Sequence, residues 1–462
     1  MNKQVNLITL LNIVSTFVLQ GIAFLTTPIF TRLLGTEQYG MYTLFNSWVL
    51  IITCIMGLSL HSSIGTGRYT FAKQYLTFRN SILLSSTLIC CIEVGIIFLF
   101  SDFWTSYLKF SNTIILLIGV TAFSHYIVNF AQTAFIYEKK AISNFILTIS
   151  VSVCSVGLSI FFIMKSSYST KYLGRIYGVV IVYFIVAIIS WIYLFLQKPT
   201  IVKKEYLKYG IIVGTPIVFH ALSQQILGQS DRIMMQAFGV ATSEVGIYSL
   251  FYTLSSVLST LLNALNNSWC PFYYDDLNEK KTKIIENKCK NYVELFTIIS
   301  IGFLLLSREV SYFMADESFW KGIEVIPILV WAIYFTFMYQ FPVNYEFFYR
   351  KTKIIAAGTV GSGVLNIILN TILIPLMGMY GAAIATAISY LALFLVHYYI
   401  VTHMKKNPYD LKIRMFIPGI IGILLGSIAF YILKPWGIIR WTIGIVLGVF
   451  EMYRVIKRKS IF

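Results

Sequence analysis

The sequence predicts an all-α, polytopic membrane protein with about 14 transmembrane helices, arranged as two six-helix lobes and two further C-terminal helices. Two observations predict this fold class. Charged residues lie in short gaps between apolar blocks of about twenty residues, and the chain repeats part of itself. Composition agrees, because 57% of the 462 residues are hydrophobic and 12% are charged, whereas soluble domains are roughly 25% charged.

Each apolar block is long enough to cross about 30 Å of hydrocarbon as a helix. The clearest blocks are residues 7–30, 42–60, 81–100, 113–135, 142–164, 355–373 and 415–433. The first block lacks a small-residue cleavage site, so we expect a retained helix and not a signal peptide. The predicted spans are centred near residues 18, 51, 91, 124, 153, 185, 218, 257, 301, 332, 364, 391, 423 and 446.

The basic residues predict the orientation of the chain. Most of the 36 Lys and Arg residues fall in alternate gaps, such as residues 198–208, 280–290 and 454–459. Basic residues concentrate on the cytoplasmic side of membrane proteins, so these gaps are expected to be cytoplasmic, and an even number of spans places both termini there as well. Topology then explains the net charge of +17, and no nucleic-acid partner is predicted.

An internal repeat predicts two copies of one helix bundle. Residues 40–45, GMYTLF, match residues 246–251, GIYSLF. The predicted domains are an N-lobe of residues 1–197, a C-lobe of residues 198–404 and an extra helix pair at residues 405–462. Because an even number of spans separates the copies, they share one orientation, an arrangement typical of transporters with a site between the halves.

Polar residues inside four spans recur at helical spacing, so each set forms one stripe on its helix. Together the stripes indicate a wet cavity, because polar groups that face lipid lack hydrogen-bond partners. The alternative for each residue is a hydrogen bond from helix to helix. The stripes are Asn12, Thr16 and Gln20; His125, Asn129 and Gln132; His220, Gln224, Gly228 and Asp231; and Ser256, Thr260, Asn263 and Asn267.

Three segments resemble a known family. Residues 31–40, TRLLGTEQYG, resemble the R-x-LG-x-x-x-YG turn after the first helix of bacterial polysaccharide repeat-unit flippases, the Wzx type of the MOP superfamily. Ser230-Asp231-Arg232 with residues 245–249, VGIYS, look like the partner turn in the second half. Residues 365–387, LNIILNTILIPLMGMYGAAIATA, are similar to the most characteristic segment of the family. Related MATE-type exporters share the general plan.

The resemblance implies both a location and a substrate. The substrate would be an undecaprenyl-pyrophosphate-linked oligosaccharide of the capsule or O-antigen type. It would be flipped from the inner to the outer leaflet of the bacterial cytoplasmic membrane by alternating access. The expected partners are this glycolipid, membrane lipids, a coupling ion, which is H⁺ or Na⁺, and the polysaccharide polymerase with other assembly proteins.

A pyrophosphate linker needs cations, and three arginines are candidates for binding it. Arg32 and Arg232 follow the first and seventh spans, and Arg175 lies at the start of the sixth span. Arg can hold phosphate oxygens with two parallel hydrogen bonds. Interfacial anchoring, or pairing with a nearby acid such as Asp231, is the alternative for each.

Two acids are candidates for ion coupling. Glu93 lies deep in its span, where a charged acid costs roughly 3 kcal/mol, and Asp231 lies in the seventh span. A protonatable coupling site explains such a residue, but so does a carboxyl that stays neutral in a bundle interior.

Two further local patterns predict structure. Gly174 and Gly178 have the small-xxx-small spacing that lets helices approach closely. Residues 273–290 have mixed charge and predict a cytoplasmic surface helix.

Three functions are compatible with a membrane protein of this composition. The flippase is favoured. A MATE-type, cation-coupled exporter of small molecules is the alternative, but the two extra spans and residues 365–387 argue against it. A membrane polymerase or ligase needs catalytic residues on a large outer loop, and the longest outer connection, near residues 308–324, contains no His. No catalytic residues, metal or other cofactor are predicted, and the chain is not expected to be an enzyme.

Overall fold

The computed structural model describes residues 3–404, 412–458 and 460, with side chains from Gly21 onwards except Ala23. The described chain is all-α, as predicted, and every predicted span centre lies in an α-helix. Eleven helical stretches of this part of the chain are long and apolar enough to cross a membrane. The chain divides into two compact units, residues 1–233 and 234–462. The lobe ranges expected from the sequence stay a prediction.

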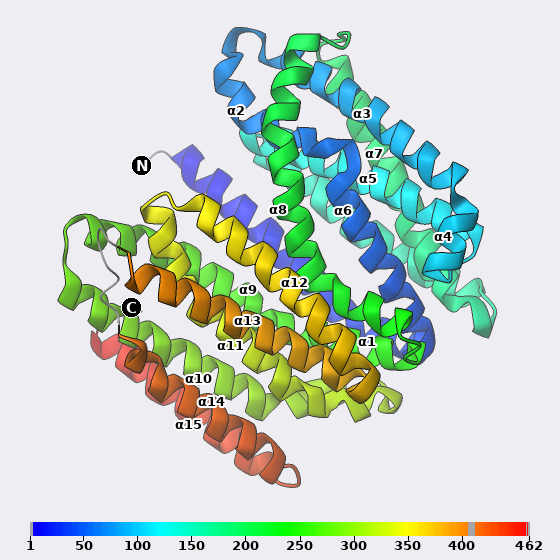
Figure 1. Ribbon diagram of the computed structural model, residues 1–462. Coiled ribbons are helices and arrows are strands. Elements are labelled where there is room, and N and C mark those ends of the chain that lie inside the picture. Colours follow the sequence, from blue (N-terminus) through cyan, green and yellow to red (C-terminus); the bar gives the residue numbers. More distant parts are fainter. Residues whose placement is uncertain (1–2, 405–411, 459, 461–462) are drawn as a thin grey trace. The chain divides into compact units, whose positions relative to one another are not determined.

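Unit 1 contains helices α1 to α7 and most of α8, which continues past the end of the unit at residue 233 (Figure 1). Its elements are α1 (Lys3–Ile55), η1 (Met56–Ser62), α2 (Ser63–Thr70), η2 (Ala72–Gln74), α3 (Tyr75–Leu99), α4 (Ser101–Leu108), α5 (Asn112–Tyr137), α6 (Ala141–Lys165), η3 (Tyr168–Thr170), α7 (Lys171–Leu196) and α8 (Lys204–Ala237).

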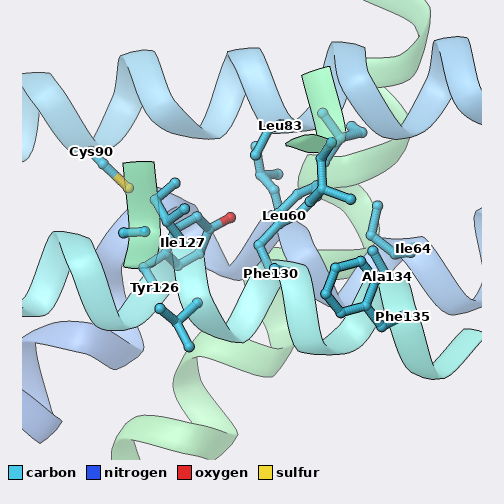
Figure 2. Close-up of a cluster of buried hydrophobic side chains, with 14 of the residues drawn as sticks. Leu60, Ile64, Leu83, Cys90, Tyr126, Ile127, Phe130, Ala134 and Phe135 are labelled. Carbon is cyan, nitrogen blue, oxygen red and sulfur yellow. The ribbon is translucent and has the colours of Figure 1, made fainter. Parts of the chain in front are cut away.

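The core of unit 1 is built around α5. Figure 2 shows side chains of η1, α2, α3 and α5 meeting in this core, and they come from segments that are far apart in the sequence. Leu60, Leu83 and Phe130 are fully buried in it. Burying such side chains contributes about 1.5–3 kcal/mol each, so this cluster holds α3 and the η1 segment against α5.

Two interruptions shape the first helices of unit 1. α1 contains two predicted spans that meet at Gly35, whose φ of 67° and ψ of 177° are not helical. The next helix is broken at η1, where Gly57, Leu58 and Ser59 have φ angles of 57°, 48° and 50°. Left-handed backbone is costly for Leu and Ser, so surrounding contacts must hold this segment in place. One of them is the hydrogen bond from the Gly57 amide to Glu93 Oε2 at 2.8 Å.

Unit 2 contains the remaining helices. They are α9 (Thr242–Asn278), α10 (Thr282–Met314), η4 (Glu317–Val325), α11 (Ile326–Phe348), α12 (Thr352–Met377), α13 (Met379–Thr402), η5 (Ile413–Phe416), α14 (Ile417–Ile432) and α15 (Gly437–Arg458). α11 packs against both α9 and α13, and α12 packs against α13. The buried residues of this core include Trp269, Tyr292 and Phe337.

The two last helices are attached to α10, as Figure 1 shows at the red end of the chain. Near one end of α10, Arg308 Nη2 donates to both carboxylate oxygens of Glu324 at 3.0 Å, and Arg440 of α15 pairs with Glu309. Ile445, Val446 and Val449 of α15 remain exposed. Apolar side chains of this kind suit a lipid-facing surface.

The expectation of a separate surface helix at residues 273–290 is wrong. α9 continues through Pro271 to Asn278, and α10 starts at Thr282, so this segment consists of the ends of two long helices. Its mixed charges pair across the turn, because Lys288 of α10 forms an ion pair with Asp276 of α9 at 2.5 Å. Local charge pattern cannot distinguish a short surface helix from two helix ends that protrude beyond the membrane.

Candidate functional site

The TRLLGTEQYG motif forms the bend of α1, and the first turn of α7 holds it. Gly35 supplies the left-handed φ of the bend, which glycine adopts without steric cost. Lys171 Nζ donates to the carbonyl oxygen of Leu33 at 3.0 Å, and the amide of Tyr172 donates to Gln38 Oε1 at 3.2 Å. The motif therefore sets the position of α1 against the start of α7.

Arg175, the next charged residue of α7, lies over aromatic rings from both halves of α1. Its guanidinium carbon is 3.7 Å from the ring centroid of Phe30 and 5.0 Å from that of Tyr42. Stacking uses the faces of the guanidinium plane and leaves the N–H groups at its edge available. Its Nη1 atom is buried and has no hydrogen-bond partner among the described residues. A buried donor of this kind favours an acceptor supplied by a ligand or by water.

His125 and Tyr183 extend this group of side chains. The His125 and Tyr183 rings stack with centroids 3.8 Å apart and an interplanar angle of 25°. Tyr183 interacts electrostatically with Arg175 and Tyr42, and the Nε2 atom of His125 is buried with no hydrogen-bond partner among the residues described. We call the five residues Phe30, Tyr42, His125, Arg175 and Tyr183 the aromatic–arginine cluster.

Arg232 of α8 is only 6% exposed. Its Nη1 atom donates to the carbonyl oxygen of Gly228 at 3.0 Å and to Gln229 Oε1 at 2.8 Å. Gln229 Oε1 also accepts a hydrogen bond from Ser47 of α1 at 2.9 Å. Arg232 and Arg175 both act electrostatically on the phenol of Tyr39, so the fold brings two of the three predicted arginines into one region of unit 1.

The other predicted polar residues of the first eight helices are dispersed. Arg32 is exposed. Gln132 donates to Thr148 Oγ1 of α6 at 3.2 Å and so links two helices of the bundle. The predicted residues Asn12, Thr16 and Gln20 lie outside the described side chains. Asn129, His220 and Gln224 are exposed on their helices. One wet cavity shared by all four stripes stays a prediction.

Unit 2 contains a cavity of about 250 Å³ between α9, α11 and α13, with hydroxyl groups in its wall. The predicted residues Ser256 and Asn263 line it, whereas the predicted Asn267 is exposed outside the lining. The buried Oγ of Ser255 has no hydrogen-bond partner in the described part of the chain. We call this space the hydroxyl cavity; its polar lining residues are Tyr252, Ser255, Ser256, Ser259, Asn263, Thr336, Thr386 and Tyr390.

The characteristic segment 365–387 forms much of the α12–α13 contact. Asn366 Nδ2 donates to Thr386 Oγ1 at 3.3 Å, and Asn370 Nδ2 donates to Asn366 Oδ1 at 3.1 Å. Both asparagines are fully buried. These amides hold the two helices together, and Thr386 continues the chain of hydrogen bonds to the wall of the hydroxyl cavity.

The two candidate coupling acids differ in their surroundings. Glu93 lines an apolar cavity of about 290 Å³ between α1, α3, α4 and α5. The indole nitrogens of Trp48 and Trp104, which line the same cavity, are buried without a hydrogen-bond partner among the described residues. Asp231 is 1% exposed and directly precedes Arg232 in α8.

Sequence reasoning missed the aromatic members of the cluster, namely Phe30, Tyr42 and Tyr183. They lie in apolar blocks, where an aromatic residue carries no distinct pattern. A signal existed only for two of them, because Phe30 and Tyr42 flank the TRLLGTEQYG motif that forms the bend. No sequence pattern predicted the hydrogen bond from the amide of Gly57 to Glu93.

Comparisons with known proteins were informative about family and fold. The model of a family described as polysaccharide biosynthesis protein matches residues 8–274. An uncharacterized membrane protein of Haemophilus influenzae is 24% identical over 405 residues, which are 84% of this chain and 95% of that protein.

Solved structures share the fold over almost the whole chain. The lipid II flippase MurJ, in an inward closed conformation, has a TM-score of 0.74 and 15% identity, with 97% of this chain and 99% of that chain covered. An inward-facing multidrug resistance MATE family transporter of the MOP superfamily has a TM-score of 0.65 and 15% identity, with coverage of 88% and 95%. The all-α, polytopic membrane fold predicted from the sequence is therefore confirmed.

Proposed function

The chain belongs to the polysaccharide biosynthesis protein family and is a multi-pass membrane protein with the MOP-superfamily fold, and on that premise we propose that it is a flippase. Its substrate is an undecaprenyl-pyrophosphate-linked oligosaccharide repeat unit of the capsule or O-antigen type. The protein moves this glycolipid from the inner to the outer leaflet of the bacterial cytoplasmic membrane by alternating access. The prediction that the chain is not an enzyme agrees with a fold shared with transporters.

The observation that carries the proposal is the unpaired, buried Nη1 of Arg175. Phe30 and Tyr42 fix the plane of this guanidinium, so its free edge is preorganised for a planar or tetrahedral oxyanion. A phosphate oxygen supplies the missing acceptor and a compensating charge. Arg232, held by Gln229, adds a second positive charge for the pyrophosphate, and exposed Arg32 is the third candidate.

The hydroxyl cavity has the chemistry to recognise sugars. Serine, threonine and asparagine side chains both donate and accept hydrogen bonds, as sugar hydroxyls do. The unpaired Oγ of Ser255 offers such a bond without breaking an existing one. The other polar residues predicted from the sequence are proposed as further contacts to the oligosaccharide: Asn12, Thr16, Gln20, His125, Asn129, Gln132, His220, Gln224, Asn263 and Asn267.

An ion gradient is proposed to drive transport, with H⁺ or Na⁺ as the coupling ion and Glu93 and Asp231 as the residues involved. Both termini are proposed to be cytoplasmic. The polymerase and other assembly proteins that use the flipped repeat unit are the proposed partners. Reporter fusions at each terminus test the orientation, since a periplasm-dependent reporter that is active at either end contradicts it.

Deletion of the gene tests the function directly. Undecaprenyl-linked repeat units should accumulate on the cytoplasmic leaflet while surface polysaccharide disappears, and the wild-type gene should restore both. Unpolymerised repeat units on the outer leaflet would instead indicate a polymerase defect and would overturn the proposal.

Substitution of Arg175 tests the proposed phosphate contact. R175A should abolish surface polysaccharide at normal protein level, and R175K should restore it only in part because Lys lacks the planar fork. R414A is the matched control, since Arg414 is exposed at η5 and has no proposed role. Export by R175A at the wild-type rate would remove Arg175 from the site.

One observation favours a second function, the cation-coupled export of small molecules. The apolar cavity that places a single carboxylate, Glu93, among tryptophan and isoleucine side chains suits a lipophilic cation. Retention of a cationic dye in the deletion strain, with surface polysaccharide intact, would establish this exporter in place of the flippase.

A further inference from the structure

The described part of unit 2 contains a buried histidine–carboxylate pair that the function proposed above does not use. His397 Nδ1 of α13 lies 2.7 Å from Glu346 Oε2 of α11. Both side chains are 0% exposed. Other buried ion pairs of the described residues, such as Arg79 with Glu138, contain an arginine, which does not release its proton in proteins. Histidine does exchange protons near neutral pH.

Each side chain of the pair has a second polar atom that forms no hydrogen bond to another described residue. Glu346 Oε1 and His397 Nε2 are both buried without a hydrogen-bond partner in the described chain. Tyr339 of α11 is the neighbouring titratable side chain, with its ring centroid 5.1 Å from that of the imidazole, and it interacts with Thr359 of α12. Among the described residues, no arginine or lysine forms an ion pair with Glu346.

The free energy cost of burying such a pair depends on its net charge, and it is lowest for the protonation state that is neutral overall. With one shared proton, the pair is neutral overall, whether it is written as carboxylate and imidazolium or as carboxyl and imidazole. Loss of that proton leaves a net negative charge, and gain of a second leaves a net positive charge. Either net charge is costly in a site without water. Proton exchange therefore requires the pair to be exposed.

Helix α12 is positioned to control that exposure. A Cβ added to Gly358 would overlap Nε2 of His397 and lie 2.8 Å from its Cε1, so the α12 backbone directly covers the unpaired nitrogen. A groove of about 490 Å³ runs along α12 and α13 beside this contact and includes Gly358, Ser362 and Val396 in its lining. Movement of α12 away from α13 at Gly358 would uncover the unpaired nitrogen of the imidazole.

We propose that Glu346 and His397 form a proton-binding site of unit 2, which takes up or releases one proton when α12 separates from α13 at Gly358. The proton comes from water, binds to the carboxylate–imidazole pair and returns to water, so no other reactant is needed. A role of this proton in driving export rests on the proposed function. Proton binding itself does not.

The test of proton binding uses the purified full-length protein and needs no glycolipid. The chain has five histidines, so ¹⁵N-histidine labelling gives few resonances, and His397 is assigned by its loss in H397Q. We expect the wild type to show a pH-dependent carboxyl band in infrared difference spectra that disappears in E346Q. H403Q is the matched control, because His403 is exposed at the C-cap of α13, six residues after His397, and it should keep the band.

The outcomes separate the pair from the transport function. An unchanged band in E346Q, or an imidazole of His397 that titrates like that of exposed His403, would overturn the proton site. G358A should change the titration without altering either group. If E346Q loses the dependence of export on the pH gradient, the coupling role stands; if it exports with full dependence, that role fails while the flippase stands. A titrating pair in a protein that moves no glycolipid would refute the flippase alone.

Discussion

Gly174 of α7 packs directly on the backbone of Ile163 in α6: a Cβ at Gly174 would lie 2.7 Å from the amide nitrogen of Ile163. One residue further along α7 is Arg175, whose carbonyl oxygen accepts a hydrogen bond from Ser159 of α6 at 3.3 Å. The close approach of the two helices therefore determines where the guanidinium of Arg175 lies. This is the contact that the small-xxx-small spacing predicted.

The crossing of α6 and α7 predicts opposite effects of the same substitution at two glycines. G174A should destabilise the protein by about 1–3 kcal/mol, because the backbone of α6 must shift. G157A, on α6, meets nothing within 4 Å and should be stabilising by up to about 1 kcal/mol through helix propensity. Thermal unfolding in detergent measures both. Equal stabilities for the two variants would contradict the close approach.

The buried Arg79 of α3 predicts a large loss of stability on substitution. Arg79 pairs with Glu138 and donates to the carbonyl oxygen of Leu194 at 2.8 Å, where α7 ends. R79A leaves Glu138 with Lys140 as its remaining partner, at 2.7 Å, and removes one of the two donors to the Leu194 carbonyl oxygen. We expect a loss of about 1–3 kcal/mol. Chemical denaturation in micelles measures it.

The exposed pair of Lys281 with Glu279 is the control for R79A. K281A should leave the denaturation midpoint almost unchanged, since water already screens both charges. A midpoint for R79A as close to wild type as that of K281A would show that the buried network contributes little.

The hydroxyl cavity predicts loss of export without loss of stability. S255A removes a hydroxyl that has no hydrogen-bond partner among the described residues. The substitution should therefore leave the free energy of unfolding nearly unchanged. We expect the double variant S255A/T336V to reduce surface polysaccharide several-fold at normal protein level. The measurement pairs quantitative glycan extraction with thermal unfolding, and full export by the double variant would exclude the cavity as a sugar site.

Substitution of Glu93 by Gln should change the ion coupling of export without changing the stability of the fold. The side-chain oxygen of Gln in E93Q can still accept the hydrogen bond from the Gly57 amide, so the left-handed η1 segment should persist and thermal stability should stay near wild type. If Glu93 is the coupling residue, E93Q export should no longer respond to collapse of the ion gradient. Gradient-dependent export at the wild-type level would end this role for Glu93, and E93A separates the two effects because it also removes the acceptor.

The membrane class, the helical positions of the apolar blocks and the family were predictable from the sequence, because each depends on local patterns. A span is a continuous apolar block, and a helical stripe is a spacing of three or four residues, so neither requires knowledge of distant contacts. Gly174 and Gly178 signalled a close helix contact for the same reason. The mixed charges of residues 273–290 misled the prediction, since the same charges occur at the ends of two long helices.

The partners of the functional side chains were decided by tertiary structure. Arg175 was a candidate from its position, but the aromatic rings that hold its guanidinium lie 145 and 133 residues away along the chain, at Phe30 and Tyr42. Glu346 and His397 are 51 residues apart and meet only because α11 packs against α13. Hydrophobicity places a segment in the bilayer through its own residues, whereas hydrogen bonds and ion pairs act over a few ångströms and depend on which helices become neighbours.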